Sequence, residues 1–198
     1  MSQTRPIHLP AADFASQLLP VSVAGPFEAF RVHGSSFPAI SFRLNPSHRF
    51  SHPDAPEGLL YLGEDLETCL WECFGDEILF AAAIAKVDWD KVLSRVSSSV
   101  PLRICDLTEL RVRRALGMDL SAMKHPELDV PQAWGLAIQE HSAAVDGLRY
   151  LSRFTGRPCL ALFERPGLAP QLQETVVSTL ARLEAADDFL DANTIALV

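Results

Sequence analysis

Residues 59–74 constrain the fold of this chain more than any other stretch, because two different patterns meet there. The apolar run 59–62 ends at Gly63, and the acidic residues Glu64 and Asp65 separate it from apolar residues at helical spacing. A short apolar run that stops at a glycine is typical of a buried strand, whereas apolar residues every three or four positions are typical of a helix. The sequence therefore predicts a buried strand that leads directly into a helix.

Two side chains of this strand-helix unit bear on function. Tyr61 lies near the end of the predicted strand, and Glu72 lies about two turns into the predicted helix. Glu72 is flanked by Trp71 and Cys73, and burying an unpaired carboxylate costs several kcal/mol. Glu72 is therefore exposed, paired or functional, and Tyr61 is either a core aromatic or part of a ligand site.

Composition indicates a folded domain that does not bind nucleic acid directly. The chain has 198 residues, of which 48% are hydrophobic and 21% charged, which is enough apolar material for one core. Its formal net charge is -8 and its lysines and arginines are scattered, whereas nucleic-acid binders usually carry a basic face. We expect residues 1–25 to be an N-terminal extension and residues 26–198 to be one domain that includes a C-terminal helix.

The cysteines and histidines indicate a reduced, cytoplasmic protein without a metal. Cys69 and Cys73 are one helical turn apart, but no second Cys/His pair accompanies them at zinc-site spacing. His48 and His52 lie in a proline-containing segment that does not favour a helix bringing them together. Residues 1–10 are polar, which argues against a signal peptide, and no apolar run is long enough to cross a membrane.

The remaining pattern mixes strands and helices without regular alternation, which indicates an α+β domain. The predicted strands are 27–33, 40–44, 78–87, 102–107, 146–152 and 158–164. The predicted helices are 11–19, 108–116, one that starts at Pro131, and 171–185. Residues 46–57 are expected to form a loop, and residues 193–198 are expected to form a last strand.

Three further polar residues are candidates for a site. Arg31 and Arg43 fall on the polar faces of the predicted strands 27–33 and 40–44, where they either face solvent or clamp an anion such as a diphosphate. Ser152 lies at the end of a strand, and no GxSxG motif surrounds it, which argues against a serine hydrolase. On its own a serine there is usually structural.

Taken together, these residues resemble the RES domain, a family that supplies the toxins of Xre–RES toxin–antitoxin pairs. The matching segments are FRVHG with Arg31, SFRLNP with Arg43, LLYLGEDLETCLWE with Tyr61 and Glu72, and DGLRYLSR with Ser152. Their order and spacing carry the resemblance, because each motif alone is weak. One departure is that the family often has Gly-Gly-Arg-Trp-Asn where this chain has Ser-Phe-Arg-Leu-Asn, so an aromatic after Arg43 is missing.

The resemblance implies a mixed, mainly antiparallel sheet similar to that of ADP-ribosyltransferases, and an enzyme that consumes NAD as substrate without a cofactor or metal. Arg31, assisted by Arg43, would hold the NAD diphosphate, and Tyr61 would pack against the nicotinamide or its ribose. Glu72 would stabilise the positive charge that develops on the ribose, and Ser152 would hydrogen-bond the ribose or the nicotinamide amide. Glu72, Arg31 and Ser152 would then be the catalytic set.

The resemblance also implies a cytoplasmic toxin that depletes NAD, acting as a glycohydrolase or phosphorylase, until an Xre-type antitoxin neutralises it. Two alternatives stay open: an ADP-ribosyltransferase that modifies a protein target, and a non-catalytic interaction module with the same fold. The helix expected from Gln171 and the tail 193–198 are candidate docking surfaces for the antitoxin. No membrane or direct nucleic-acid partner is expected, and homodimerisation stays open.

Overall fold

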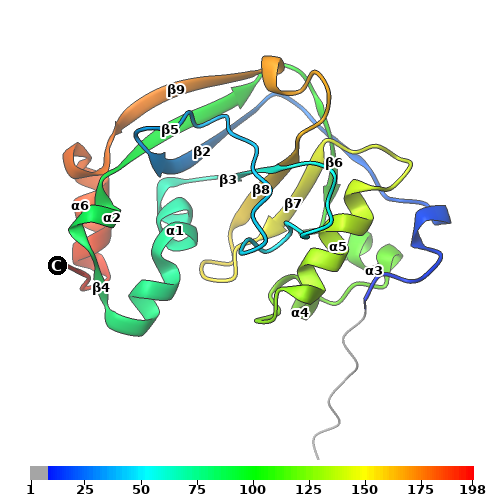
Figure 1. The fold of residues 1–198 in the computed structure, drawn as a ribbon, viewed down its shortest axis with the longest axis horizontal. Coiled ribbons are helices and arrows are strands. Elements are labelled where there is room, and N and C mark those ends of the chain that lie inside the picture. Colours follow the sequence, from blue (N-terminus) through cyan, green and yellow to red (C-terminus); the bar gives the residue numbers. More distant parts are fainter. Residues whose placement is uncertain (1–8) are drawn as a thin grey trace, which may run out of the picture.

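A curled eight-stranded sheet dominates the computed structural model, which describes residues 9–198 (Figure 1). The strand order is β1-β6-β7-β8-β3-β2-β5-β9, and every neighbouring pair is antiparallel except β6 and β7, which are parallel. The strands of this sheet are β1 (Ser22–Ala24), β2 (Phe27–Gly34), β3 (Leu59–Gly63), β5 (Lys91–Ser98), β6 (Leu102–Asp106), β7 (Gly147–Leu151), β8 (Pro158–Phe163) and β9 (Leu172–Thr179). The expected α+β fold with a mixed, mainly antiparallel sheet is confirmed.

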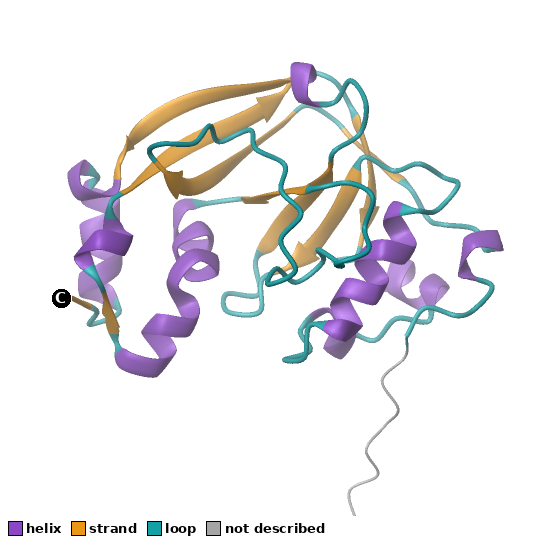
Figure 2. Ribbon diagram, in the orientation of Figure 1, coloured by secondary structure: helices purple, strands orange, loops and turns teal. Residues whose placement is uncertain are grey.

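Helices stand at the two ends of this sheet (Figure 2). Their bounds are α1 (Leu66–Ala81), α2 (Lys86–Trp89), α3 (Leu110–Leu116), α4 (Leu120–Met123), α5 (Asp129–Gln139) and α6 (Glu184–Ala192). Three 3-10 turns add Phe14–Ser16, Ala169–Gln171 and Leu180–Arg182, and a small parallel sheet pairs β4 (Ala83–Ile84) with β10 (Ala196–Leu197). The last strand expected in the tail is therefore confirmed as β10.

The large sheet forks between β2 and β3. Strand β3 pairs with β8 from Leu59 to Gly63, along its whole length, but it pairs with β2 only through Phe30 and Gly63. Strand β2 in turn pairs with β5 along all of its length. The sheet thus consists of two halves joined at one point, and the opening between β2 and β3 is the place where a ligand cavity can form.

The strand-helix unit predicted from residues 59–74 is confirmed, and its junction shows why the chain turns there. The carboxylate of Asp65 caps α1 by accepting a hydrogen bond from the backbone N–H of Thr68, at 2.7 Å. A Cβ atom at Gly63 would lie 2.7 Å from the Cys69 sulfur, so the close approach of β3 to α1 requires a glycine. This junction fixes the direction of α1 relative to the fork.

Hydrophobic residues form three buried clusters on the two sides of the fork. One is centred on Trp134 of α5 and the phenyl ring of Phe50, and another on Phe74 of α1 with Phe189 of α6. A third lies against the other face of the sheet and includes Leu60 and Val96. Loop 46–57, which was expected to be irregular and contains no helix or strand, contributes Phe50 to the first cluster.

The expected helix 171–185 is wrong. Its first half is strand β9, which pairs with β5, and α6 begins only at Glu184. The segment 175–179 reads Thr-Val-Val-Ser-Thr, and β-branched residues favour strands, which outweighs the apolar residues at helical spacing. One of the two expected docking surfaces, the helix from Gln171, therefore does not exist in that form.

The expected strand 78–87 is also wrong. Helix α1 continues through Ala81 and ends at Ala82, which has a left-handed backbone with φ of 48°, and only β4 is extended. A short apolar run cannot be assigned to strand or helix by periodicity alone, and alanine favours the helix. Phe80 is 97% exposed, so this run is not a central strand. The sequence patterns missed β5, which lies between β2 and the edge strand β9.

Two shorter predictions are corrected as well. Residues 40–44 do not form a strand, because only Arg43 bridges to Leu59, and the N–H of Ile40 is taken by the Glu174 carboxylate. Residues 11–19 form only the 3-10 turn Phe14–Ser16, since the hydroxyl of Ser16 bonds the Asp13 carbonyl in place of a helical pattern. The expected N-terminal extension contributes strand β1 to the sheet edge, and its residues 1–8 lie outside the described part of the chain.

Candidate active site

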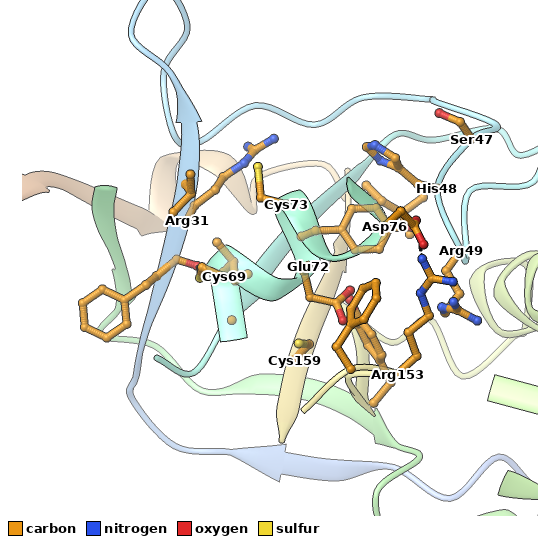
Figure 3. A pocket seen from close by; sticks show the side chains of 18 of the residues that line it. Arg31, Ser47, His48, Arg49, Cys69, Glu72, Cys73, Asp76, Arg153 and Cys159 are labelled. Carbon is orange, nitrogen blue, oxygen red and sulfur yellow. Dashed lines mark hydrogen bonds and ion pairs between the residues drawn. The ribbon is translucent and has the colours of Figure 1, made fainter. Parts of the chain in front are cut away.

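A cavity of about 450 Å³ opens at the fork of the sheet (Figure 3). Strands β2 and β3, helix α1, the loop before β3 and the turn between β7 and β8 all contribute to its walls. Its volume lies in the range usual for small-molecule sites. Arg31, Arg43, Tyr61 and Glu72, four of the five candidates from the sequence, line it together.

Ser152, the fifth candidate, lies behind Glu72 and is fully buried, with 0% of its surface exposed. Its hydroxyl donates a hydrogen bond to Oε1 of Glu72 at 2.5 Å and accepts the backbone N–H groups of Phe154 and Thr155, both at 3.2 Å. Glu72 itself is exposed through the cavity. Glu72 is therefore both exposed and paired, and one oxygen of its carboxylate is fixed by a serine from another element.

The turn that carries Ser152 is attached to α1 at two further points. Arg153 forms an ion pair with Asp76, one turn beyond Glu72 on α1 (Figure 3). Phe154 packs where α1 has Gly75, because a Cβ atom there would lie 2.5 Å from the Phe154 ring. The β7–β8 turn therefore fits the helix only at this register, which holds the Ser152–Glu72 hydrogen bond in place.

The two arginines predicted from the sequence come from different elements, because Arg31 lies on β2 whereas the backbone of Arg43 bridges to Leu59 of β3. Arg31 donates to the backbone carbonyl of Ser41 at 3.1 Å and also to that of Ala39. Burial, together with the charge of Arg43, lowers the pKa of Arg31 below its usual value. The guanidinium of Arg43 stacks over Phe37, with 4.2 Å from its central carbon to the ring centroid. Both side chains are thus held near the cavity by local contacts.

Sequence reasoning missed two residues on the opposite side, Arg49 and Arg153, which Figure 3 shows across the cavity from Arg31 with Glu72 between them. Arg49 donates to the carbonyls of Met123 and His125, at 2.9 and 3.0 Å, and burial followed by the charge of Arg153 lowers its pKa. The one signal that could have found Arg49 is its place in a loop without regular structure, where binding residues concentrate.

His48, weighed from the sequence only as a metal ligand, also lines the cavity. Its ring packs edge-on against Tyr61, with 5.2 Å between the ring centroids. The Tyr61 hydroxyl accepts the backbone N–H of Phe50 at 3.1 Å, and burial raises the pKa of Tyr61 above its usual value of 10.0. Tyr61 is therefore a neutral aromatic part of the cavity wall at physiological pH.

Burial disfavours the thiolate form of the three cysteines that line the cavity. Burial raises the pKa of Cys69 from 9.0 to about 12 and that of Cys73 from 9.0 to about 11. The pKa of Cys159 is also raised by burial. A thiol reacts as its thiolate, so these three groups stay protonated and act as apolar wall. Among residues 9–198, no group of three or more His, Cys, Asp or Glu side chains is arranged to hold a metal ion.

Charge distinguishes the cavity from the rest of the molecule. Its charged lining residues are Arg31, Arg43, Arg49, Glu72, Asp76 and Arg153. This set has a formal excess of two positive charges, whereas the whole chain has a net charge of -8. Concave sites of one sign focus their field and attract ligands of the opposite sign. The cavity is therefore suited to a doubly charged anionic group beside the Glu72 carboxylate, because Asp76 is already paired with Arg153.

The fold and the cavity define an α+β protein with a cationic ligand cavity at a fork in its sheet. A model of the RES domain matches residues 28–182, and the chain therefore belongs to the RES domain family, as the motifs indicated. No curated protein matches it at a significant level. Among solved structures, one chain of the M. tuberculosis MbcT–MbcA toxin–antitoxin complex is similar, with a TM-score of 0.61 and 18% identity, covering 86% of this chain and 92% of that chain. This likeness shows that the two share a fold.

Within the described residues, no helix combines the length and the apolar character that crossing a membrane demands. The longest helix, α1, has 16 residues and carries Glu72 and Asp76 toward the cavity.

Proposed function

We propose that this protein binds NAD in the cavity and cleaves it at the bond between nicotinamide and ribose, as a glycohydrolase or phosphorylase. The observation that carries the proposal is Glu72, a carboxylate fixed by Ser152 in a cavity whose other charges are mainly arginines. The diphosphate of NAD bears two negative charges, which complement the excess of two positive charges in the lining. Membership of the RES domain family supports the same assignment.

The chemistry follows from the placement of these groups. Loss of nicotinamide leaves positive charge on the ribose, as in glycoside hydrolysis. A carboxylate that is already oriented stabilises this charge without reorganising during the reaction. Ser152 orients Oε1 of Glu72, and Oε2 has no hydrogen-bond partner among the described residues, so it is left for the substrate. Nicotinamide departs as a neutral molecule, so the reaction needs no metal.

The binding groups divide between the two sides of the cavity. Arg31 and Arg43 on one side, and Arg49 on the other, are held by carbonyl, hydroxyl or ring contacts and keep their charge for the diphosphate. Tyr61 offers a neutral face to the nicotinamide or its ribose. In this assignment Ser152 acts through Glu72, and a direct contact with the ribose or the amide stays a prediction.

We further propose that the protein is a cytoplasmic toxin held inactive by an antitoxin partner. The similar solved structure is a toxin–antitoxin complex, which supports this role. The four cysteines are all free thiols, which fits a reducing compartment. An antitoxin that covers the cavity mouth would block access to Glu72.

The test is nicotinamide release from NAD by the purified protein, with and without phosphate, using Glu72→Gln as the matched control. Release in both buffers with ADP-ribose as product supports a glycohydrolase, and release only with phosphate supports a phosphorylase. In a parallel reaction with biotinylated NAD, transfer of biotin to protein would instead support the ADP-ribosyltransferase alternative. Absence of release and of label would contradict NAD cleavage and leave the non-catalytic module.

A further inference from the structure

The loop at residues 45–51, here called the cavity loop, supplies Ser47, His48 and Arg49 to the cavity. It contains no helix or strand, but two backbone hydrogen bonds shape its turns, from the His48 N–H to the Asn45 carbonyl at 2.9 Å and from the Ser51 N–H to the His48 carbonyl at 3.2 Å. These bonds set the local shape of the loop, whereas its placement against the cavity depends on bonds made to it by other elements.

Gln132 on α5 makes two hydrogen bonds to the backbone of the cavity-lining part of this loop. Its side-chain Nε2 donates to the carbonyl of Pro46 at 2.6 Å and to that of His48 at 3.1 Å. These carbonyls lie on either side of Ser47, and the second belongs to the peptide bond that leads to Arg49. Gln132 is buried, with 7% of its surface exposed, so water does not readily replace it.

The next turn of the same helix packs closely against the backbone of the cavity loop. A Cβ atom at Gly135 would lie 2.3 Å from the carbonyl oxygen of Phe50. Residues three apart lie on one face of a helix, so Gln132 and Gly135 form a continuous contact along the cavity loop. Arg49 completes it by bonding the carbonyl of Met123 in α4 and that of His125 just after it.

We propose that Gln132 is a positioning residue of the cavity: its amide holds the cavity loop so that Arg49 and His48 face the substrate. This inference rests on the proposed function, because the substrate is taken to be NAD. Gln132 is absent from the cavity lining and acts through the loop. Its loss is expected to weaken substrate binding, while the Glu72–Ser152 centre on α1 and the β7–β8 turn is left intact.

The chain contains a matched control on the same helix. Gln139 is also buried, with 2% exposure, and its Nε2 donates to the carbonyl of Glu57 at 3.0 Å. Glu57 precedes β3 and takes no part in the cavity. Both glutamines therefore donate a hydrogen bond from α5 to a backbone carbonyl in the segment before β3. Only Gln132 bonds the cavity loop.

The experiment compares Gln132→Met and Gln139→Met, which keep the side-chain length and remove the donors. Nicotinamide release gives kcat and KM for NAD, and hydrogen–deuterium exchange reports the opening of residues 46–51. Gln132→Met is expected to raise KM about tenfold, since a lost hydrogen bond is worth up to about 1.5 kcal/mol. Its kcat should change by less than about twofold, because the lost contacts bind the substrate and the transition state equally. Gln139→Met should leave KM and the exchange of residues 46–51 as in wild type.

Each outcome decides the proposal. Wild-type KM and exchange in Gln132→Met would overturn it, and so would an equal rise of KM in both variants, since that indicates general loosening of α5. If Gln132→Met does not fold, Gln132→Leu, which also lacks the donors and adds no buried charge, takes its place in both measurements. If wild-type protein fails to turn over NAD, the proposed function fails, and the exchange of residues 46–51 alone decides whether Gln132 holds the loop.

Discussion

Replacing Ser152 by alanine tests the link between the fold and the proposed reaction most directly. The change removes the hydrogen bond to Glu72 and leaves the N–H groups of Phe154 and Thr155 without their acceptor. Because Glu72 is exposed, water replaces part of the first bond, and we expect a loss of about 2–3 kcal/mol in the free energy of unfolding. In a chain of this length each kcal/mol lowers the Tm by about 2–4 °C, so the expected fall is about 4–12 °C.

The same variant should lose activity as well as stability. Without the serine hydroxyl the Glu72 carboxylate can turn, and misplacing a reacting group costs up to about a hundredfold in rate. The control is Thr155→Val in the same turn, because Thr155 accepts the N–H of Arg157 and makes no hydrogen bond to Glu72. Calorimetry gives the Tm and nicotinamide release gives kcat. A Ser152→Ala protein with wild-type Tm and wild-type kcat would refute the claim that Ser152 orients Glu72.

Four further perturbations have defined outcomes. Glu72→Gln should keep the wild-type Tm, because the amide oxygen still accepts from Ser152, and should lower kcat about 10²–10³-fold in the nicotinamide assay. Arg31→Ala should weaken NAD binding measured by calorimetry, and unchanged affinity would remove Arg31 from the diphosphate site. Asp65→Ala removes the cap of α1 and should cost about 1 kcal/mol in urea unfolding. Burial raises the pKa of Cys73 from 9.0 to about 11, so this thiol loses its proton at a lower pH in the unfolded chain than in the folded one. The free energy of unfolding should therefore fall as pH rises from 9 to 11. Under reducing conditions the urea midpoint of Cys73→Ala should fall less over this pH range than that of the wild type.

Local patterns were sufficient where a local interaction decides the structure. The strand at residues 59–63 and the start of α1 follow from one apolar run, one glycine and the capping carboxylate of Asp65. The same patterns failed at residues 171–185, where pairing with β5 and a β-branched run made a strand of residues that also have helical spacing. The choice there depends on a partner strand about eighty residues earlier in the chain, which no window of sequence contains.

The candidate site divides in the same way. Motifs pointed to Arg31, Tyr61 and Glu72, which the structure brings to one cavity. The motifs could not show that Ser152 lies behind Glu72, because the two residues are 80 positions apart and meet only through the packing of a turn on α1. Arg49 was missed for a similar reason, since its direction depends on carbonyls of residues more than 70 positions later.

The fork in the sheet explains why these distant residues meet. A fully paired sheet would fill the space between β2 and β3 with backbone hydrogen bonds, whereas these strands pair only through Phe30 and Gly63. Helix α1 begins directly after that point, so its first turns, including Glu72, line the opening. Ser152 follows β7 in the half of the sheet that contains β3 and β8, Arg31 lies on β2 in the other half, and Glu72 lies on α1 between them. Substrate bound across the fork would therefore bridge the two halves, and NAD is expected to raise the Tm of the Glu72→Gln protein, in which it is consumed slowly.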